Sequence, residues 1–486
     1  MPQKDLIAAA LLLVALFGGV IVTSCSKRIR DIFFVGMILL APMTEDYDVN
    51  FLSRDFYRGT TRGIEVSLVD VIALSLLISS VLFPRRGHSR AFWPASFGLI
   101  LLFFLYACFN VGIADPRIFG LFELSKMVRG MTIFLAVALF VQSERELKLF
   151  LLALGLIVSY EGFLALRQRY QYGIHRVPGT LDDSNSLSVF FVTTAPVFVA
   201  VINSRVPKAL KMLSAAAIAF ACVGVILTIS RMGVAILAVT LLCVTFATIS
   251  FYITARKIVI GLVVVLLAAG LTAKSWKTLK ARFQESSLGE EYKDNGKLGR
   301  GYYIRVARAI AEDQLFGVGL NNWSYWVSQK YGPRLGYRFV PYRGTDKDPS
   351  IYIPPDSNVD EAQAAPAHSL GALTVGELGL PGLVLFTILW CRWFQMGATF
   401  LRKRRPEPLF RIGTGLFFAL AALFLQSLTE WVFRHSPIYY TAHILLGVLA
   451  SLYWLKRKAA KAAAREIAIE ETEEIYASPS PSAALA

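Results

Sequence analysis

The sequence predicts an all-α, polytopic integral membrane protein. Of its 486 residues, 55% are hydrophobic and only 17% are charged, whereas a soluble protein carries about 25% charged residues. The mean hydropathy is +0.53, and the apolar residues form runs close to the length that crosses a bilayer as a helix. A large soluble core is therefore excluded, and we expect about 12 to 14 transmembrane helices.

The apolar runs define the predicted helices in chain order. They cover residues 6–24, 31–43, 66–83, 92–113, 118–141, 147–165, 187–203, 209–229, 232–253, 257–273, 369–391, 409–428 and 436–455. The second run is short for a crossing, so it could also be half of a broken helix or a re-entrant segment.

Lysine and arginine concentrate in short loops between these runs. Such loops mark the cytoplasmic side of a membrane protein, and this explains the formal net charge of +16 without a nucleic-acid partner. The most basic loops are 84–90, 204–208, 256–257, 402–405 and 456–458. If they are cytoplasmic, the N-terminus lies outside, unless one of the first two runs does not cross.

One long polar segment lies on the outer side in this topology. Arg300 to Gln314 has apolar residues spaced three and four apart, as in a helix, and Gly317-Val318-Gly319 ends it. Loops of this length are usually functional. The predicted domains are N-terminal transmembrane helices (1–273), a large, partly helical periplasmic loop or lid (274–367), C-terminal transmembrane helices (368–456) and a cytoplasmic tail, a short helix followed by disorder (457–486).

Several charged residues gather at the outer face. They are Arg176, Arg231, Arg300, Arg305, His368, Glu430 and Arg434. Charged groups this close to lipid are costly unless they are paired or used. The planar guanidinium group matches phosphate oxygens, and histidine can take a proton from a hydroxyl near neutral pH. This set would suit a lipid with a diphosphate headgroup.

Each of these residues also has a structural interpretation. Arg231 could be a topology residue at the membrane edge, and Arg176 could pair with Asp182 or Asp183. His368 could cap its helix or pair with an acid. Asp182 to Asn185 could cap the helix that follows.

Buried charges elsewhere suggest packing roles. Glu377 lies about 13.5 Å along a helix from His368 and on its opposite side, so we expect it to anchor helix packing rather than form a dyad. Two intramembrane ion networks are possible, one of Asp115, Glu123, Lys126 and Arg129, the other of Glu161 and Arg167.

No cofactor is expected. The five cysteines lie in or beside apolar runs and the five histidines are scattered, which predicts neither a disulfide framework nor a metal site. Gly317-Val318-Gly319 lacks the preceding strand and third glycine of a dinucleotide fingerprint. Composition alone leaves an enzyme and a transporter open.

The order of these motifs resembles the bacterial O-antigen ligase and polymerase superfamily (the WaaL and Wzy proteins). The resemblance covers roughly residues 60–450. Its motifs are Arg176 with Gly179-Thr180 and Asn185, Ser230-Arg231, Arg300 ahead of Phe316-Gly317-Val318-Gly319, His368-Ser369 with Glu377-Leu378-Gly379, and Thr429-Glu430 with Arg434. The sequence departs from the family at Ser369, where asparagine is frequent, and at Gln314, where a proline precedes the glycine pair.

The resemblance implies a GT-C-like, metal-independent glycosyltransferase of the bacterial inner membrane, active at the periplasmic face. The donor would be an undecaprenyl-diphosphate-linked glycan. The acceptor would be a hydroxyl of lipid A-core for a ligase, or another lipid-linked O-antigen or exopolysaccharide unit for a polymerase. A polysaccharide transporter or flippase is a third interpretation, but related halves are not evident.

The resemblance also assigns roles by position. Arg231 and Arg300 would hold the diphosphate, with Arg305 as the alternative loop arginine. His368 would activate the acceptor hydroxyl or assist the leaving diphosphate. The supporting substrate-binding residues would be Arg176, Arg305, Arg434, Asn185 and Glu430. With one base and direct displacement, we expect inversion at the anomeric carbon.

Overall fold

The structure is a computed structural model that describes residues 3–54, 56–85, 87–89, 92–248, 280, 300–337, 339–340, 363–401 and 406–477. Within these residues every predicted apolar run forms a helix, and the predicted run at 257–273 lies outside them. The long helices are α1 (Gln3–Cys25), α2 (Lys27–Leu40), α3 (Leu68–Leu82), α4 (Phe97–Ile113), α5 (Arg117–Phe140), α6 (Glu144–Tyr170), α7 (Ser184–Ile202), α8 (Lys208–Thr228), α9 (Arg231–Thr248), α15 (Leu370–Ala398), α16 (Pro408–Ser427) and α17 (Ser436–Ala477).

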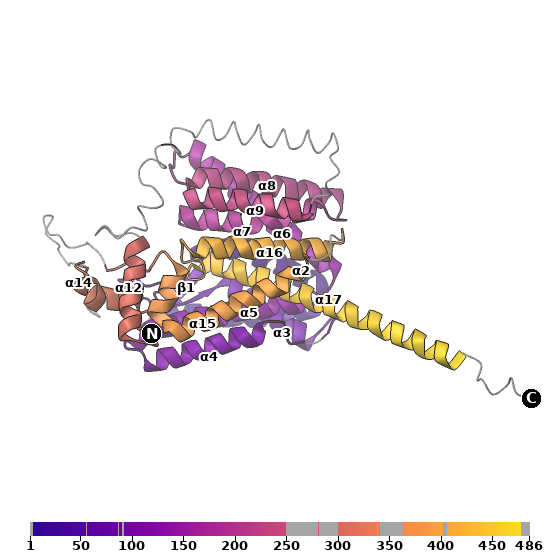
Figure 1. The fold of residues 1–486 in the computed structure, drawn as a ribbon, viewed down its shortest axis with the longest axis horizontal. Helices are drawn as coiled ribbons and strands as arrows, with labels where there is room; N and C mark the ends of the chain where they lie inside the picture. The colour runs from indigo at the N-terminus through magenta and orange to yellow at the C-terminus, as the bar shows by residue number, and fades with distance from the viewer. Residues whose placement is uncertain are drawn as a thin grey trace, which may run out of the picture.

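These helices pack side by side into a bundle (Figure 1). The most extensive helix pairs are α7 with α16 and α8, α6 with α8, and α5 with α17 and α3. One large apolar core runs through them and includes Phe34, Phe134, Phe190, Leu416 and Tyr440. Tight packing of apolar side chains supplies most of the stability of such a bundle.

The outer surface of the bundle is also apolar, as lipid requires. On α1, Leu11, Val14 and Phe17 are each about two-thirds exposed. In the described part of the chain, eight helices are long and apolar enough to cross a membrane, and α3 and α4 are shorter apolar helices. The protein is therefore an all-α, multi-pass membrane protein.

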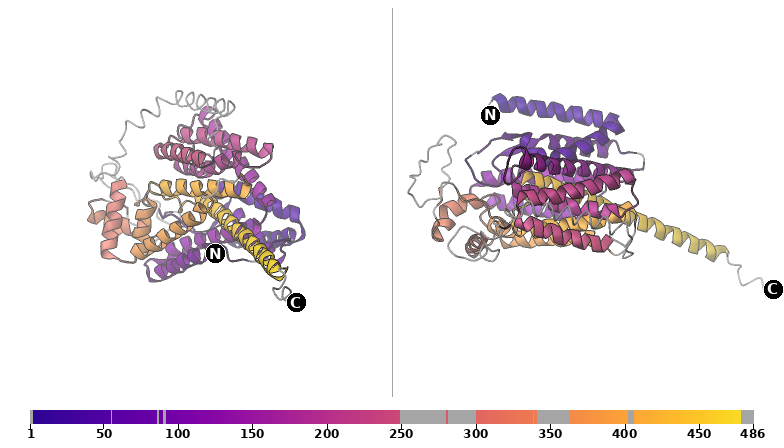
Figure 2. Two further views of the ribbon diagram at one scale, coloured as in Figure 1. Left: turned by 45° about the vertical axis from the view of Figure 1, so that its right-hand side comes forward. Right: turned by 90° about the horizontal axis from the view of Figure 1, so that it is seen from above.

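The first two helices form an antiparallel pair. In α2, Arg30 donates to the carbonyls of Thr23, near the end of α1, and Phe83, just after α3. The α1–α2 turn therefore lies at the same end of the bundle as the end of α3. The chain begins at the opposite end of the bundle, which is also the end that carries the loop helix α12 (Arg300–Asp313) (Figure 2).

The segment between α2 and α3 contains an element that the apolar pattern did not predict. After a 3₁₀ turn, η1 (Ala41–Asp46), strands β1 (Asp48–Phe51) and β2 (Ile64–Ser67) form an antiparallel hairpin. Its connecting loop contacts the polar segment between α9 and α15: Asn321 accepts from Thr60 N at 2.8 Å and donates to the carbonyl of Thr61 at 2.7 Å.

The described part of the predicted loop is largely helical. It comprises α12, which matches the predicted helix at 300–314, α13 (Trp323–Trp326), a π-helical turn η2 (Val327–Tyr331) and α14 (Gly332–Arg334). These elements share a small apolar core around Tyr302, Ile310, Trp323, Tyr331 and Leu373. The loop is thus anchored to the start of α15.

The segment between α12 and α13 docks on a break in α15. Gly379 has φ 69° and ψ −172°, a region that is essentially restricted to glycine. The break exposes backbone groups, so Val318 N donates to Gly376 O, Gly319 N to Glu377 O and Leu380 N to Leu315 O.

Replacing Gly379 with alanine is expected to destabilise the protein strongly. A Cβ atom there would overlap the carbonyl oxygen of Leu315, and the backbone conformation would itself cost about 1–3 kcal/mol. A lower midpoint of thermal unfolding in detergent would check this. Gly371→Ala is the matched control, because a Cβ at Gly371 meets nothing within 4 Å.

The last helix differs from the prediction. Instead of ending near residue 455 and being followed by a separate short helix, α17 runs without interruption to Ala477 and projects from the bundle (Figure 1). Its extension is rich in alanine, lysine and glutamate, which are strong helix formers.

Candidate functional site

His368 and Glu430 form a polar pair at one end of the bundle. His368 immediately precedes Ser369, which caps α15 by accepting from Ala372 N. Glu430 lies in the turn between α16 and α17. His368 Nδ1 lies 2.9 Å from Glu430 Oε2, and Arg300 Nη2 lies 3.9 Å from Oε1 of the same carboxylate.

This arrangement can orient the imidazole for proton transfer. A carboxylate at Nδ1 stabilises the tautomer with its proton on Nδ1, which leaves Nε2 able to accept a proton. The His368 side chain is 40% exposed and that of Glu430 only 12%, so the histidine is accessible and its partner is shielded. The pairing of His368 with Glu430 agrees with the structural interpretation, in which His368 pairs with an acid. The same geometry also suits a general base.

Aromatic rings flank the imidazole. The ring centroids of Tyr303 and Trp431 lie 5.9 and 6.0 Å from that of His368. Burial and the nearby Glu430 carboxylate raise the pKa of Tyr303, so its phenol stays protonated at neutral pH. Aromatic faces of this kind can stack on sugar rings or shield the site from water.

A second polar group lies where α7, α8 and α9 meet. Arg176 donates to Asn185 Oδ1 at 2.8 Å and to the carbonyl of Thr228 at 3.4 Å. Asp183 caps α7 through the amides of Asn185 and Ser186, as the capping interpretation predicted. In the described structure, Arg176 thus pairs with the amide of Asn185 and not with Asp182 or Asp183.

Arg231 begins α9 beside this group. The chain turns sharply after Thr228 because Ile229 adopts the left-handed conformation, with φ 56°. The Ser230 hydroxyl then accepts from Gly233 N. This turn holds the half-buried Arg231 at the same end of the bundle as Arg176.

The two polar groups lie at one end of the molecule. Arg205 N, just after α7, donates to Pro406 O, just before α16, and the two helices pack along each other. The start of α7 therefore lies at the same end as the turn after α16, which carries Glu430.

The two loop arginines have different surroundings. Arg300, at the start of α12, faces Glu430. Arg305 donates to the Tyr337 hydroxyl at 2.8 Å and lies 5.6 Å above the same ring. Of the two, Arg300 is the one that lies beside the His368–Glu430 pair.

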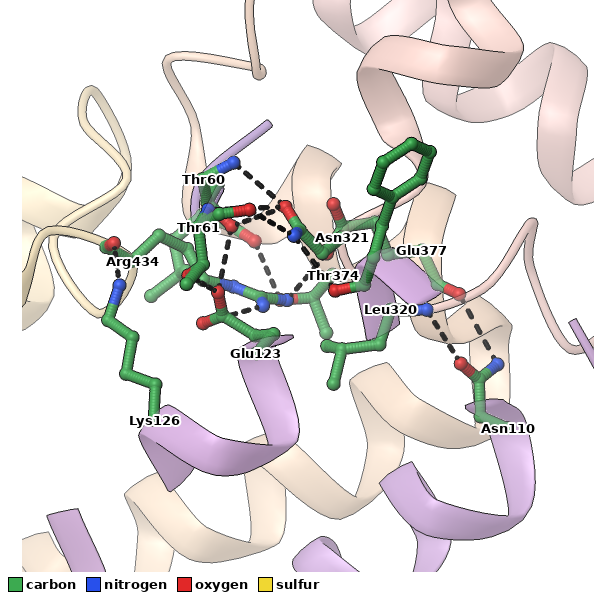
Figure 3. Close-up of polar contacts among 12 residues, drawn as sticks. Thr60, Thr61, Asn110, Glu123, Lys126, Leu320, Asn321, Thr374, Glu377 and Arg434 are labelled. Atoms are coloured by element: carbon green, nitrogen blue, oxygen red, sulfur yellow. Dashed lines mark hydrogen bonds and ion pairs between the residues drawn. The ribbon is translucent and has the colours of Figure 1, made fainter. Parts of the chain in front are cut away.

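Arg434 is held in a buried ion network (Figure 3). Its guanidinium contacts Glu377 at 2.7 Å and Glu123 at 3.1 Å, and Lys126 donates to its backbone carbonyl. Only 7% of Arg434 is exposed. The geometry argues against the predicted direct contact of Arg434 with substrate, because two buried carboxylates require its charge. Glu377 has the packing role expected of it.

The predicted intramembrane networks are rearranged. Glu123 and Lys126 join Arg434, whereas Arg129 pairs with Asp70 at 2.8 Å. The carbonyl of Asp115 accepts from the Trp326 indole. Glu161 accepts from the Thr180 hydroxyl at 2.5 Å, and Arg167 donates to Gln171.

Comparison with known proteins adds one match. Residues 216–387 match the family model described as O-antigen ligase, a stretch that contains Arg231, Arg300, Arg305 and His368. No curated protein matches the chain. The matched stretch covers roughly a third of the 486 residues, and the helices on either side of it belong to the same bundle. The match confirms, over this stretch, the predicted resemblance to the O-antigen ligase and polymerase superfamily.

Proposed function

We propose that the protein is an inverting, metal-independent glycosyltransferase of the bacterial inner membrane. It moves a glycan from an undecaprenyl-diphosphate donor to an acceptor hydroxyl at the periplasmic face. The observation that carries this proposal is the His368–Glu430 pair with Arg300 beside it. An accessible base next to a guanidinium group suits attack by a hydroxyl with loss of a diphosphate.

The reaction is a single displacement. His368 Nε2 takes the proton of the acceptor hydroxyl as its oxygen attacks the anomeric carbon, and the bond from that carbon to the diphosphate oxygen breaks. Glu430 stabilises the imidazolium that forms. Arg300 and Arg231 stabilise the charge on the leaving diphosphate, and Arg176, with Asn185, supports Arg231 from the neighbouring helix ends.

We favour a ligase, with lipid A-core or a similar glycan as acceptor. This preference rests on the pattern of the long polar loop, since the family match fits a ligase and a polymerase alike. A polymerase would use the same chemistry on a second lipid-linked repeat, of O-antigen or of exopolysaccharide. A surface-glycan gel of a deletion strain separates the two: uncapped core with accumulated lipid-linked chains indicates a ligase, and core capped by single repeats indicates a polymerase.

The direct test is reconstitution with a lipid-diphosphate-linked oligosaccharide and candidate acceptors, in the presence of EDTA. Arg231→Gln is expected to lower the rate of transfer by about 10²-fold or more, as the loss of one preplaced donor does elsewhere. Arg167→Gln is the control, because Arg167 is exposed at the same end of the bundle. Substrate movement across liposomes without bond formation would instead support a transporter.

A further inference from the structure

A second polar cavity lies at the opposite end of the bundle from His368. It is a small cavity that opens to solvent, and its polar lining comes from Arg30, Ser80, Arg85, His88, Ser89 and Gln142. Phe140 at the end of α5 also lines it, about 25 Å along that helix from Glu123. The cavity is therefore separate from the site proposed for glycan transfer.

Arg30, which lines the cavity, is buried without forming an ion pair in the described structure. Only 4% of it is exposed. Its guanidinium donates to the carbonyls of Thr23 at 3.0 Å and Phe83 at 2.9 Å, and in the described structure it forms no ion pair. Nη2 of Arg30 makes no hydrogen bond with a described group. A buried cation with only carbonyl partners is costly.

Arg85 adds a second guanidinium group. It contacts Asp31 at 2.6 Å and Glu146 at 2.8 Å, and its side chain is only 8% exposed. Its Nε is buried without a partner among the described groups, although buried N–H donors are almost always paired. Arg30 and Arg85 thus each keep a donor unused where both line the cavity.

Among the described residues, the ionisable groups that line the cavity are all basic. They are the guanidinium groups of Arg30 and Arg85 and the imidazole of His88, while the carboxylates of Asp31 and Glu146 contact Arg85 from outside the lining. An anion would balance this basic lining and would supply an acceptor for Nη2 of Arg30.

We propose that this cavity binds a phosphate group. Arginine forks match phosphate oxygens in charge and geometry, and basic pockets between transmembrane helices on the cytoplasmic side bind anionic lipid headgroups. The phosphate would belong to an anionic phospholipid of that leaflet or be free inorganic phosphate. The proposal does not depend on the reaction at His368.

The test uses the full chain in detergent after removal of lipid. Phosphatidylglycerol, phosphatidylcholine with the same acyl chains, and inorganic phosphate are added separately, and the midpoint of thermal unfolding is followed. We expect phosphatidylglycerol to raise it more than phosphatidylcholine does. A rise with inorganic phosphate alone identifies the free ion as the ligand. Equal effects of both lipids with none from phosphate would overturn the proposal.

Variants assign the effect to the cavity. Arg30→Gln is expected to weaken the response to phosphatidylglycerol or phosphate by about tenfold or more, the value of a charge-assisted hydrogen bond. Arg145→Gln removes the same charge from a side chain that is 64% exposed and does not line the cavity, so the response should persist. If it weakens the response equally, only net charge matters and the cavity is not the site.

A third variant covers the case in which Arg30→Gln does not fold. Ser80→Leu fills the cavity without changing any charge, and it should abolish the selective response. A Ser80→Leu protein that still responds fully to phosphatidylglycerol or phosphate would also rule out binding in this cavity.

Discussion

Replacing His368 with alanine is expected to lower the rate of glycan transfer by about 10²–10⁴-fold, the usual contribution of a positioned general base. Nε2 of His368 would otherwise take the proton of the attacking hydroxyl. Helix packing should be little affected, because the side chain is 40% exposed and its polar partner is Glu430. The rate is measured in the reconstituted assay, with thermal unfolding as the check on folding.

Glu430→Gln separates positioning from catalysis. An amide at this position cannot stabilise the imidazolium, so kcat should fall while KM for the acceptor changes little. Glu430→Asp should recover part of kcat, because the carboxylate is restored on a shorter side chain.

His175→Ala is the control for His368→Ala, since His175 is an exposed histidine in the loop before α7. Full transfer by His368→Ala would remove this residue from the mechanism.

Much of the fold was predictable because lipid imposes strong rules on sequence. A run of apolar residues bounded by basic loops can hardly be anything but a membrane helix, and the described helices follow those runs. The β1–β2 hairpin was missed because its strands are only four residues long and lie 12 residues apart, in polar sequence. The extension of α17 was missed because polar sequence was expected to end the helix with its membrane span.

The residue types of the candidate site were predictable, but their partners were not. Charge at a membrane face must be paired or used, and this principle selected Arg300, His368, Glu430 and Arg434. It could not show that Glu430 faces His368, 62 residues away in the chain. Nor could it separate Arg300 from Arg305, which are five residues apart on one helix and point to different partners.

Asn321 shows what sequence reasoning overlooked. It follows the glycine pair in the left-handed conformation, with φ 59°, which asparagine tolerates better than most residues. Its amide donates to the carbonyls of Thr61 and Phe119, so it joins the hairpin loop, α5 and the polar segment. The sequence signal for this left-handed turn was Gly319-Leu320-Asn321-Asn322, in which a glycine is followed by paired asparagines.

Arg434→Met is expected to destabilise the protein by about 3–5 kcal/mol, the usual cost of breaking a buried ion pair. The variant leaves Glu123 and Glu377 without their shared guanidinium, and these carboxylates are only 2% and 1% exposed. One oxygen of Glu377 already lacks a described partner. The measurement is the free energy of unfolding in detergent, compared with Arg308→Gln, which removes an arginine whose side chain is 80% exposed.

A compensating variant distinguishes an ion network from a substrate contact. Adding Glu377→Gln and Glu123→Gln to Arg434→Met removes the unpaired charges, so much of the lost stability should return. If Arg434 instead binds substrate, Arg434→Met should keep its stability and lose glycan transfer, and the glutamine substitutions should restore nothing. Stability and transfer rate are measured on the wild type, Arg434→Met, the triple variant and the Arg308→Gln control. Together they decide whether this arginine supports the fold or contacts the substrate.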